Sequence, residues 1–158
     1  MAIRKIRLVP DEILRKKSRS VEVVDKKIQD LVEDMLEAMY RSEGIGMAAV
    51  QVGVLRRVVV MDVSEERNRP IVIINPEILH SEGSQVHQEA CLSIPDLSGT
   101  VERPYLTIVK GLDRNGEPQE LRCEGDLSIV VNHEIDHLDG ILYTDKATEF
   151  FSTEDDED

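Results

Sequence analysis

The sequence predicts a single domain of the α+β class. Three observations support this class. The 158 residues suffice for one hydrophobic core, helical hydrophobic spacing occurs near the start of the chain and again near its end, and β-branched runs fill the middle. No internal repeat or interdomain linker interrupts this order. We therefore expect helices at both ends of the chain and small antiparallel or mixed sheets packed around a central helix.

The first predicted helix spans residues 25–43. Asp25 is a candidate N-cap, and Gly44 stands just past the expected end. Apolar side chains recur at spacings of three and four residues, at Ile28, Leu31, Val32, Met35, Leu36, Met39 and Tyr40. This pattern predicts an amphipathic helix that packs one face on the core.

Four strands are predicted in the middle of the chain. Residues 57–63 (RVVVMDV) and 71–75 (IVIIN) are rich in β-branched side chains and are separated by polar SEERNRP, which predicts two buried strands joined by a loop. Residues 105–113 and 118–125 flank the turn signal Arg114-Asn115-Gly116, which predicts a β-hairpin.

The second predicted helix follows Gly125, and Gly140 would end it. Its apolar stripe consists of Leu127, Val130, Val131, Ile135 and Leu138. The segment NHEIDHLDG (132–140) therefore lies on a partly buried helix, which is the central helix of the predicted fold.

Composition restricts the class of function. The formal charge of −13 and the aromatic content of 3% argue against a nucleic-acid platform, which needs a basic face and stacking side chains. The longest apolar runs, such as Val58 to Met61, are far shorter than the roughly 20 residues of a membrane span. The N-terminus shows no apolar segment of a secretory signal. We expect a cytoplasmic protein with no membrane partner and no direct nucleic-acid partner.

The chain ends in the acidic run EDDED. Residues 149–158 are expected to form an acidic, disordered tail, and a partner-binding tail is the alternative. Residues 1–148 would then form the folded domain.

The motif HEIDH has the spacing of a metal site. Positions i and i+4 lie on one face of a helix, so the imidazoles of His133 and His137 can reach the same ion. Glu134 is rotated by about 100° around the helix axis, where it can accept a proton during metal-assisted hydrolysis. The alternative is a chance match, in which both histidines are ordinary buried polar groups.

Two histidines require a third ligand. Extended zinc-peptidase motifs place a histidine where this chain has Tyr143. His80 and His87 are possible donors, although each is expected to be a surface residue. Cys91 in QEACLSIPD is the better donor, because disulfides are rare in the cytosol and a thiolate is a strong metal ligand. Cys123 is interpreted as a small apolar residue on a strand.

Three segments together resemble the peptide deformylase family. Gly44 to Gln51 matches its G-x-G-x-A-A-x-Q motif, Glu89 to Ser93 matches E-G-C-L-S at all but one place, and His133 to His137 matches H-E-x-D-H. The resemblance extends from the N-terminal helix to about residue 145. Residues 44–49 also fit a dinucleotide fingerprint, but that motif needs a strand before it, and a helix is predicted there.

The resemblance implies a role for each motif residue. The metal ligands would be Cys91, His133 and His137. The general acid/base would be Glu134. The tetrahedral oxyanion would be stabilised by Gln51 and the backbone amide of Leu92. The peptide substrate would bind as an added strand against Gly44, Ile45, Gly46 and Val130.

The same resemblance implies an enzyme that removes the N-formyl group from formylmethionine at the start of newly made polypeptides and releases formate. Residues 1–148 would be its catalytic domain, and N-formyl-methionyl peptides its substrates. The family's natural ion is Fe²⁺, and Zn²⁺, Ni²⁺ or Co²⁺ can replace it. Some members dock on the ribosome through a basic C-terminal helix. This chain ends in FFSTEDDED, so we do not carry that docking over.

Other functions remain open on the sequence alone. They are another metallopeptidase or amidase activity, and a nonenzymatic or substrate-shifted metal-binding protein. A covalent mechanism with Cys91 as nucleophile and His133 as base leaves Glu134 and His137 without a role.

Three positions depart from the family pattern. Val50 stands where Pro or Thr is usual, which is expected to soften the segment that carries Gln51. Ala90 replaces a glycine, at a cost of about 1 kcal/mol if its φ is positive. Asp126 replaces an apolar residue of the methionine pocket, so altered substrate preference is expected.

Overall fold

The computed structural model describes residues 4–152 of the chain. Its two α-helices are α1 (Lys26–Arg41) and α2 (Asp126–Leu138). Its strands are β1 (Gly46–Ala48), β2 (Val58–Met61), β3 (Ile71–Glu82), β4 (Gln85–Cys91), β5 (Ile94–Arg103), β6 (Leu106–Leu112), β7 (Pro118–Glu124) and β8 (Glu149–Ser152). The short 3-10 helices are η1 (Glu12–Arg15), η2 (Ala49–Val52) and η3 (Tyr143–Asp145).

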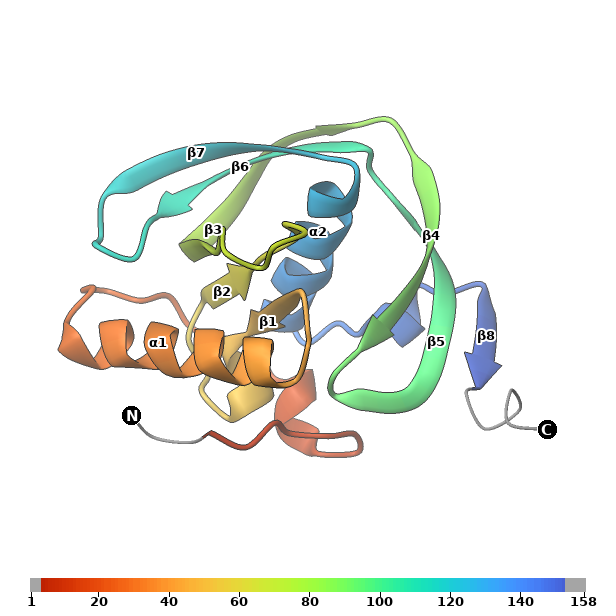
Figure 1. The fold of residues 1–158 in the computed structure, drawn as a ribbon, viewed down its shortest axis with the longest axis horizontal. Helices are drawn as coiled ribbons and strands as arrows, with labels where there is room; N and C mark the ends of the chain where they lie inside the picture. Colours follow the sequence, from red (N-terminus) through yellow and green to blue (C-terminus); the bar gives the residue numbers. More distant parts are fainter. Residues whose placement is uncertain (1–3, 153–158) are drawn as a thin grey trace.

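The strands form two separate sheets. One has five strands in the order β1-β2-β3-β6-β7, and the other has three in the order β4-β5-β8, and all neighbouring strands in both sheets are antiparallel. Helix α2 lies between the arch of β3, β6 and β7 and the sheet of β4, β5 and β8, and α1 runs below the five-stranded sheet (Figure 1). The predicted α+β class with a central helix is confirmed.

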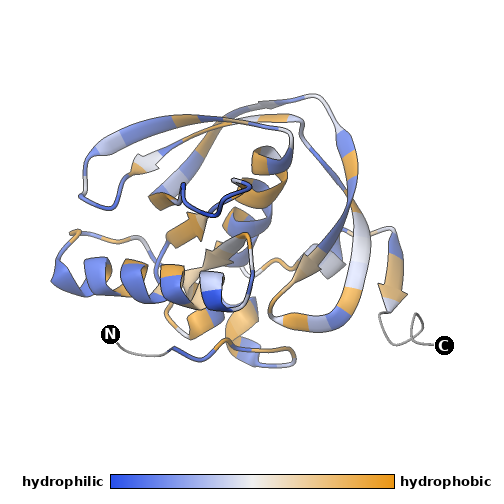
Figure 2. Cartoon of the chain, viewed as in Figure 1, coloured by the Kyte–Doolittle hydropathy of each residue, from blue (hydrophilic) through white to orange (hydrophobic). Residues whose placement is uncertain are grey.

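Helix α1 forms where the hydrophobic spacing predicts it. Asp25 is the N-cap, and its Oδ1 accepts a hydrogen bond from the Ile28 amide at 3.1 Å. The helix ends at Arg41 rather than at residue 43, because Glu43 has a φ of 58° and cannot continue it. The buried face of α1 packs on β1, β2 and β3 in the largest hydrophobic cluster, and polar residues cover its outer face (Figure 2).

Helix α2 packs its apolar stripe on the inner face of the five-stranded sheet. Val130, Val131 and Ile135 meet a cluster from β2, β3, β6 and β7 that includes Met61, Ile73, Val109 and Cys123. Cys123 is buried, and burial raises the pKa of its thiol to about 11, so it is the small core residue that was expected.

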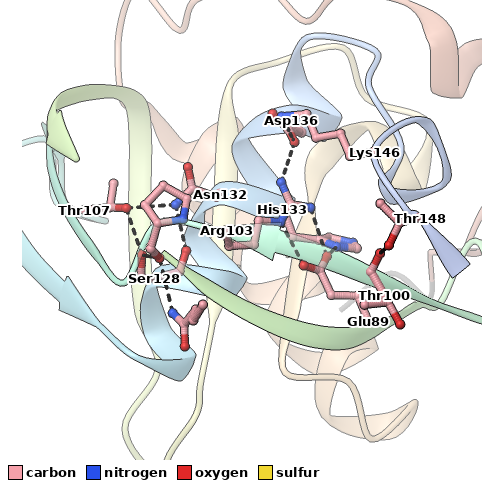
Figure 3. Close-up of polar contacts among 12 residues, drawn as sticks. Glu89, Thr100, Arg103, Thr107, Ser128, Asn132, His133, Asp136, Lys146 and Thr148 are labelled. Atoms are coloured by element: carbon pink, nitrogen blue, oxygen red, sulfur yellow. Dashed lines mark hydrogen bonds and ion pairs between the residues drawn. The ribbon is translucent and has the colours of Figure 1, made fainter. Parts of the chain in front are cut away.

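A buried polar cluster also fixes α2 against β6 (Figure 3). The hydroxyls of Thr107 and Ser128 lie 2.8 Å apart, and Asn132 Nδ2 donates to Thr107 Oγ1 at 2.8 Å. Ser128 Oγ donates in turn to the Pro104 carbonyl at 2.7 Å. These bonds set the rotation of α2 about its axis, and with it the direction of its functional face.

The predicted strands 57–63 and 71–75 are confirmed as β2 and β3, although β3 continues to Glu82. The predicted hairpin is β6 and β7, in register from Leu106↔Glu124 to Leu112↔Pro118. Strands β1, β4, β5 and β8 were not predicted.

The expected tail differs from the structure in its first residues. Glu149–Ser152 form β8, which pairs antiparallel with β5 from Thr100↔Glu149 to Leu97↔Ser152. The adjacent Phe150 and Phe151 favour a strand. The prediction of a disordered tail rested on the acidic residues and gave too little weight to these two aromatic residues. Residues 153–158 of the expected tail lie outside the described residues.

None of the helices described over residues 4–152 has both the length and the apolar character needed to cross a membrane.

Candidate metal centre and peptide cleft

Three potential metal ligands converge between β4 and α2. The thiol of Cys91, at the end of β4, and the imidazoles of His133 and His137, one turn apart on α2, place their ligand atoms within 4.8 Å of one another. Cys91 Sγ lies 3.3 Å from His137 Nε2. A tetrahedral ion with bonds of about 2.3 Å to sulfur and about 2.1 Å to nitrogen separates its ligand atoms by less than 4 Å. The distance between Cys91 and His137 already meets this limit, and small side-chain adjustments bring all three ligand atoms within reach of one transition-metal ion.

One carboxylate orients the first histidine. His133 Nδ1 lies 2.8 Å from Glu89 Oε1, which leaves Nε2 of the same ring for an ion. Glu89 is held by Arg103, whose Nε and Nη2 donate to its two oxygens at 2.8 and 2.9 Å (Figure 3). Hydrogen bonds from Arg103 and His133 outweigh burial and lower the pKa of Glu89 to about 2.

The guanidinium of Arg103 also reaches back to the helix. Arg103 Nη1 donates to Asp136 Oδ2 at 2.8 Å, and Lys146 Nζ approaches the same oxygen at 2.9 Å. Arg103 and Glu89 are both at most 5% exposed, so their charges are screened little by solvent. The three side chains Glu89, Arg103 and Asp136 thus tie β4, β5 and α2 together behind the ligands.

The electrostatic surroundings favour a cation at the trio. Burial opposes protonation of His133, yet the carboxylate of Glu134, with the nearby Cys91 and Glu89, raises its pKa to about 10. A divalent ion held by the trio would be stabilised by the carboxylates of Glu134 and Glu89 and would take the place of the proton on the ligating nitrogen of His133. His137 differs, because burial and the neighbouring His133 lower its pKa and keep its ring neutral, as a ligand must be.

Glu134 lies beside the trio and faces the cleft. The side chain is 4% exposed, and its Oε1 has no hydrogen-bond partner among the described residues. Burial, followed by the charge of Glu89, raises its pKa to about 7. A carboxyl group with that pKa can take up and return a proton near neutral pH.

Gly46 allows the main chain to approach Glu134 closely. A Cβ added at Gly46 would lie 2.7 Å from Glu134 Oε2 and 2.7 Å from Val130 Cγ1, so no side chain fits there. Asp62 N donates to the Ile45 carbonyl, so the main-chain carbonyl of Ile45 points toward β2. Gly46 is the next residue, opposite Met61 of β2. Because main-chain groups of adjacent strand residues point to opposite sides, the N–H and C=O of Gly46 face the open edge of β1.

Gln51 is held with its amide nitrogen toward the trio. Its Oε1 accepts from the Ala48 amide at 3.0 Å, and its Nε2 donates to Ser93 Oγ at 3.1 Å and toward Cys91 Sγ at 3.6 Å. The side chain is 1% exposed. Leu92 follows in the turn after Cys91, where its side chain packs against Gly44.

Gly46, Cys91, Leu92, His133 and Glu134 line one cleft of about 340 Å³. The cleft lies between two strands that are both sheet edges, β1 and β4. Its walls are residues 43–46 and 87–92, and its floor is the α2 face with Ile129, Val130, His133 and Glu134. A smaller pocket of about 170 Å³ shares Ile45, His87, Ile129 and Val130 with it and adds Val63 and Asp126. An extended peptide between the two edges therefore has a side pocket within reach.

A family model and curated relatives both match this chain over nearly its whole length, and they name the same family. A family model described as polypeptide deformylase matches residues 3–151. A peptide deformylase of Caldicellulosiruptor bescii is 53% identical over 154 residues, covering 98% of this chain and 91% of that protein.

The chain belongs to the peptide deformylase family.

Further peptide deformylases agree in sequence and in fold. Peptide deformylase 1 of Clostridium acetobutylicum is 50% identical, over 94% of this chain and 97% of that protein. The crystal structure of the Legionella pneumophila enzyme is 45% identical with a TM-score of 0.90, over 93% of this chain and 87% of that one. The crystal structure of the Thermotoga maritima peptide deformylase is 38% identical with a TM-score of 0.89, over 94% of this chain and 100% of that one.

Membership of the family defines the activity in general terms. This chain is a metal-dependent hydrolase that removes N-formyl groups from newly made peptides. The nonenzymatic alternative is not favoured.

The structure resolves two of the departures from the deformylase pattern. Ala90 is not among the non-glycine residues with positive φ, so the expected strain is absent. Val50 is buried with Val59 and Leu138 in a small apolar cluster, which anchors η2 rather than softening it. Asp126 is exposed and lines the 170 Å³ pocket, as its position in the deformylase pattern suggested.

Sequence reasoning missed part of this deformylase site. His80 and His87 are exposed as expected, but His87 also lines the cleft. Glu89 stands inside the second motif, so its position could have drawn attention to it. The sequence around Arg103 carries no comparable signal, because its partner Asp136 is 33 residues away.

Proposed function

We propose that this deformylase acts on N-formyl-methionyl peptides with a single Fe²⁺ held by Cys91, His133 and His137. The convergence of one thiol and two imidazoles beside the carboxylate of Glu134 supports this proposal most directly. A soft thiolate with two imidazoles suits iron or zinc, and nickel or cobalt fits the same donors. The proposed setting is the cytoplasm, on nascent chains.

The peptide would bind in extended form between the open edges of β1 and β4. The N–H and C=O of Gly46 are available for pairing, with Gly44 and Ile45 beside them. The methionine side chain would enter the apolar part of the cleft over Val130. The carboxylate of Asp126, which lines the adjoining smaller pocket, would then lie near the distal end of that side chain.

Glu134 would move the protons of the reaction. When bound, the ion supplies Lewis acidity that polarises the formyl group and makes water more acidic. The unpartnered Oε1 of Glu134 accepts a proton from the attacking water and later returns it to the leaving amine. Burial of the carboxylate excludes bulk water from this transfer.

Gln51 and the amide of Leu92 would stabilise the oxyanion that develops on the formyl oxygen. Two donors that are fixed before the reaction are effective because they need no reorganisation. The contacts of Gln51 with the Ala48 amide and Ser93 hold its amide group in one orientation.

The test is formate release from a formyl-Met tripeptide by protein that is purified anaerobically. Glu134→Gln keeps the size of the side chain and removes its basicity, so we expect kcat to fall by about 10²- to 10⁴-fold. The bound metal is quantified in both proteins, because unchanged metal content assigns the loss to proton transfer. Absence of formate from metal-loaded wild-type protein would contradict the proposal. The same metal analysis identifies the ion.

A further inference from the structure

We propose that Arg67 is a positioning residue that fixes the main chain next to the peptide-binding edge of β1. Arg67 lies outside all three sequence motifs, in the loop of residues 62–70 between β2 and β3. This inference rests on the proposed binding of the peptide beside Gly46.

The guanidinium of Arg67 joins two loops. Its Nη1 donates to the carbonyl of Asp62 at 2.9 Å, and its Nη2 donates to the carbonyl of Gly44. The same group lies over the ring of Tyr40, 5.3 Å from the ring centroid. Arg67 itself has a φ of 57°, which is unfavourable for a side chain with a Cβ. These contacts hold a conformation that the residue would otherwise rarely adopt.

The loop beneath Arg67 is fixed by a buried carboxylate. Asp62 is fully buried; its Oδ1 accepts from the amide and hydroxyl of Ser64 at 2.8 and 2.5 Å. Its Oδ2 accepts from the Tyr40 hydroxyl at 2.6 Å and from the Arg69 amide at 3.1 Å. These bonds fix the base from which Arg67 reaches Gly44.

The same loop holds two consecutive carbonyls of the cleft wall. Asp62 N donates to the Ile45 carbonyl at 2.9 Å, and Arg67 donates to the Gly44 carbonyl. These carbonyls belong to the two residues before Gly46, the residue whose main chain faces the open edge. Ile45 is 49% exposed, so packing of its side chain contributes little to fixing this segment.

Small shifts of this segment matter because Gly46 packs so closely on the site. A Cβ at Gly46 would meet Val130 Cγ1 at 2.7 Å, which shows how little space separates the strand edge from the floor of the cleft where the peptide would bind. A guanidinium can span two carbonyls with its planar fork, whereas an ammonium group is a single point of attachment. Arginine is therefore the suitable residue at position 67.

The test compares Arg67→Met with Arg69→Met in the metal-loaded full-length protein. Both variants remove one positive charge from the same loop, but the hydrogen bond of Arg69 to Asp62 comes from its main-chain amide, which the substitution keeps. We expect Arg67→Met to raise KM for a formyl-Met tripeptide by about tenfold with kcat within about twofold, because the loss falls on binding. Arg69→Met should match the wild type.

Arg67→Lys provides a second comparison if Arg67→Met does not fold. A single ammonium contact should restore part of the function, with a KM between those of the wild type and Arg67→Met. An unchanged KM in a folded Arg67 variant, or a loss that falls on kcat alone, would overturn the inference. Wild-type protein without formate release would instead contradict the proposed function, so the two failures are distinguishable.

Discussion

At Gly46, the addition of a single methyl group is enough to disturb the candidate site. A methyl group there has no space, because it would lie 2.7 Å from both Glu134 Oε2 and Val130 Cγ1. Gly46 is not one of the glycines with positive φ, so alanine is compatible with its main chain. Substitution should therefore act on the site and leave the backbone conformation unchanged.

We predict that Gly46→Ala lowers kcat/KM for formate release by about 10²-fold, since a displacement of about 1 Å at a reacting group has that effect. Circular dichroism and metal content should match the wild type. Wild-type kinetics in this variant would show that Glu134 tolerates the displacement, which would contradict the packing argument.

At the scale of elements, the junction of β4, β5 and α2 depends on a buried ion pair. Arg103 is 3% exposed and bonds both Glu89 and Asp136. Replacing one partner of a buried pair leaves the other charge uncompensated. An exposed pair on β7, Arg122 with Glu124, offers a matched control.

Arg103→Met should lower the free energy of unfolding by about 3–5 kcal/mol, the typical result of breaking a buried pair. Arg122→Met should change it by at most about 1 kcal/mol, because exposed ion pairs contribute little. Urea unfolding of the two variants measures both values. Equal effects would mean that water screens Arg103 despite its burial.

The sequence predicted the elements with regular hydrophobic patterns and missed those without them. Helix α1 and strands β2, β3, β6 and β7 have such patterns, and all were predicted. Strand β4 is largely exposed and polar, and β5 mixes buried and exposed positions without regular alternation, so neither strand is marked by alternation or by an apolar run. Their pairing is specified by contacts with each other and with α2, which a local pattern does not contain.

The candidate site divides in the same way. His133, Glu134 and His137 lie in one motif whose spacing is itself a chemical requirement. Cys91 lies in a second short motif, so the sequence indicated all four residues. Arg103 and Arg67 act through partners that are distant in sequence, Asp136 and Gly44. Only the folded chain brings these partners together.

At the scale of the whole molecule, the proposed metal centre joins the two sheets. Cys91 comes from the three-stranded sheet, while His133 and His137 come from the helix that packs on the five-stranded sheet. An ion bound by these residues binds only the folded state, and so contributes its binding free energy to folding.

Removal of the metal by a chelator should lower Tm by roughly 10 °C. A ligand present at about a thousandfold excess over its Kd stabilises by about 4 kcal/mol, and each kcal/mol corresponds to about 2–4 °C for a domain of this size. Cys91→Ala is the control, and the chelator should shift its Tm much less. An identical shift in both proteins would place the stabilising ion elsewhere.

The free edges of β1 and β4 have a biological consequence under the proposed binding mode. Amide groups are common to all polypeptides, so a cleft that pairs with them accepts peptides whatever residues follow the first methionine. A folded protein offers its first amides for such pairing only where its N-terminal residues are not tied down by its own structure. Under the proposed binding mode, the open edges of β1 and β4 therefore favour chains whose first residues are still extended.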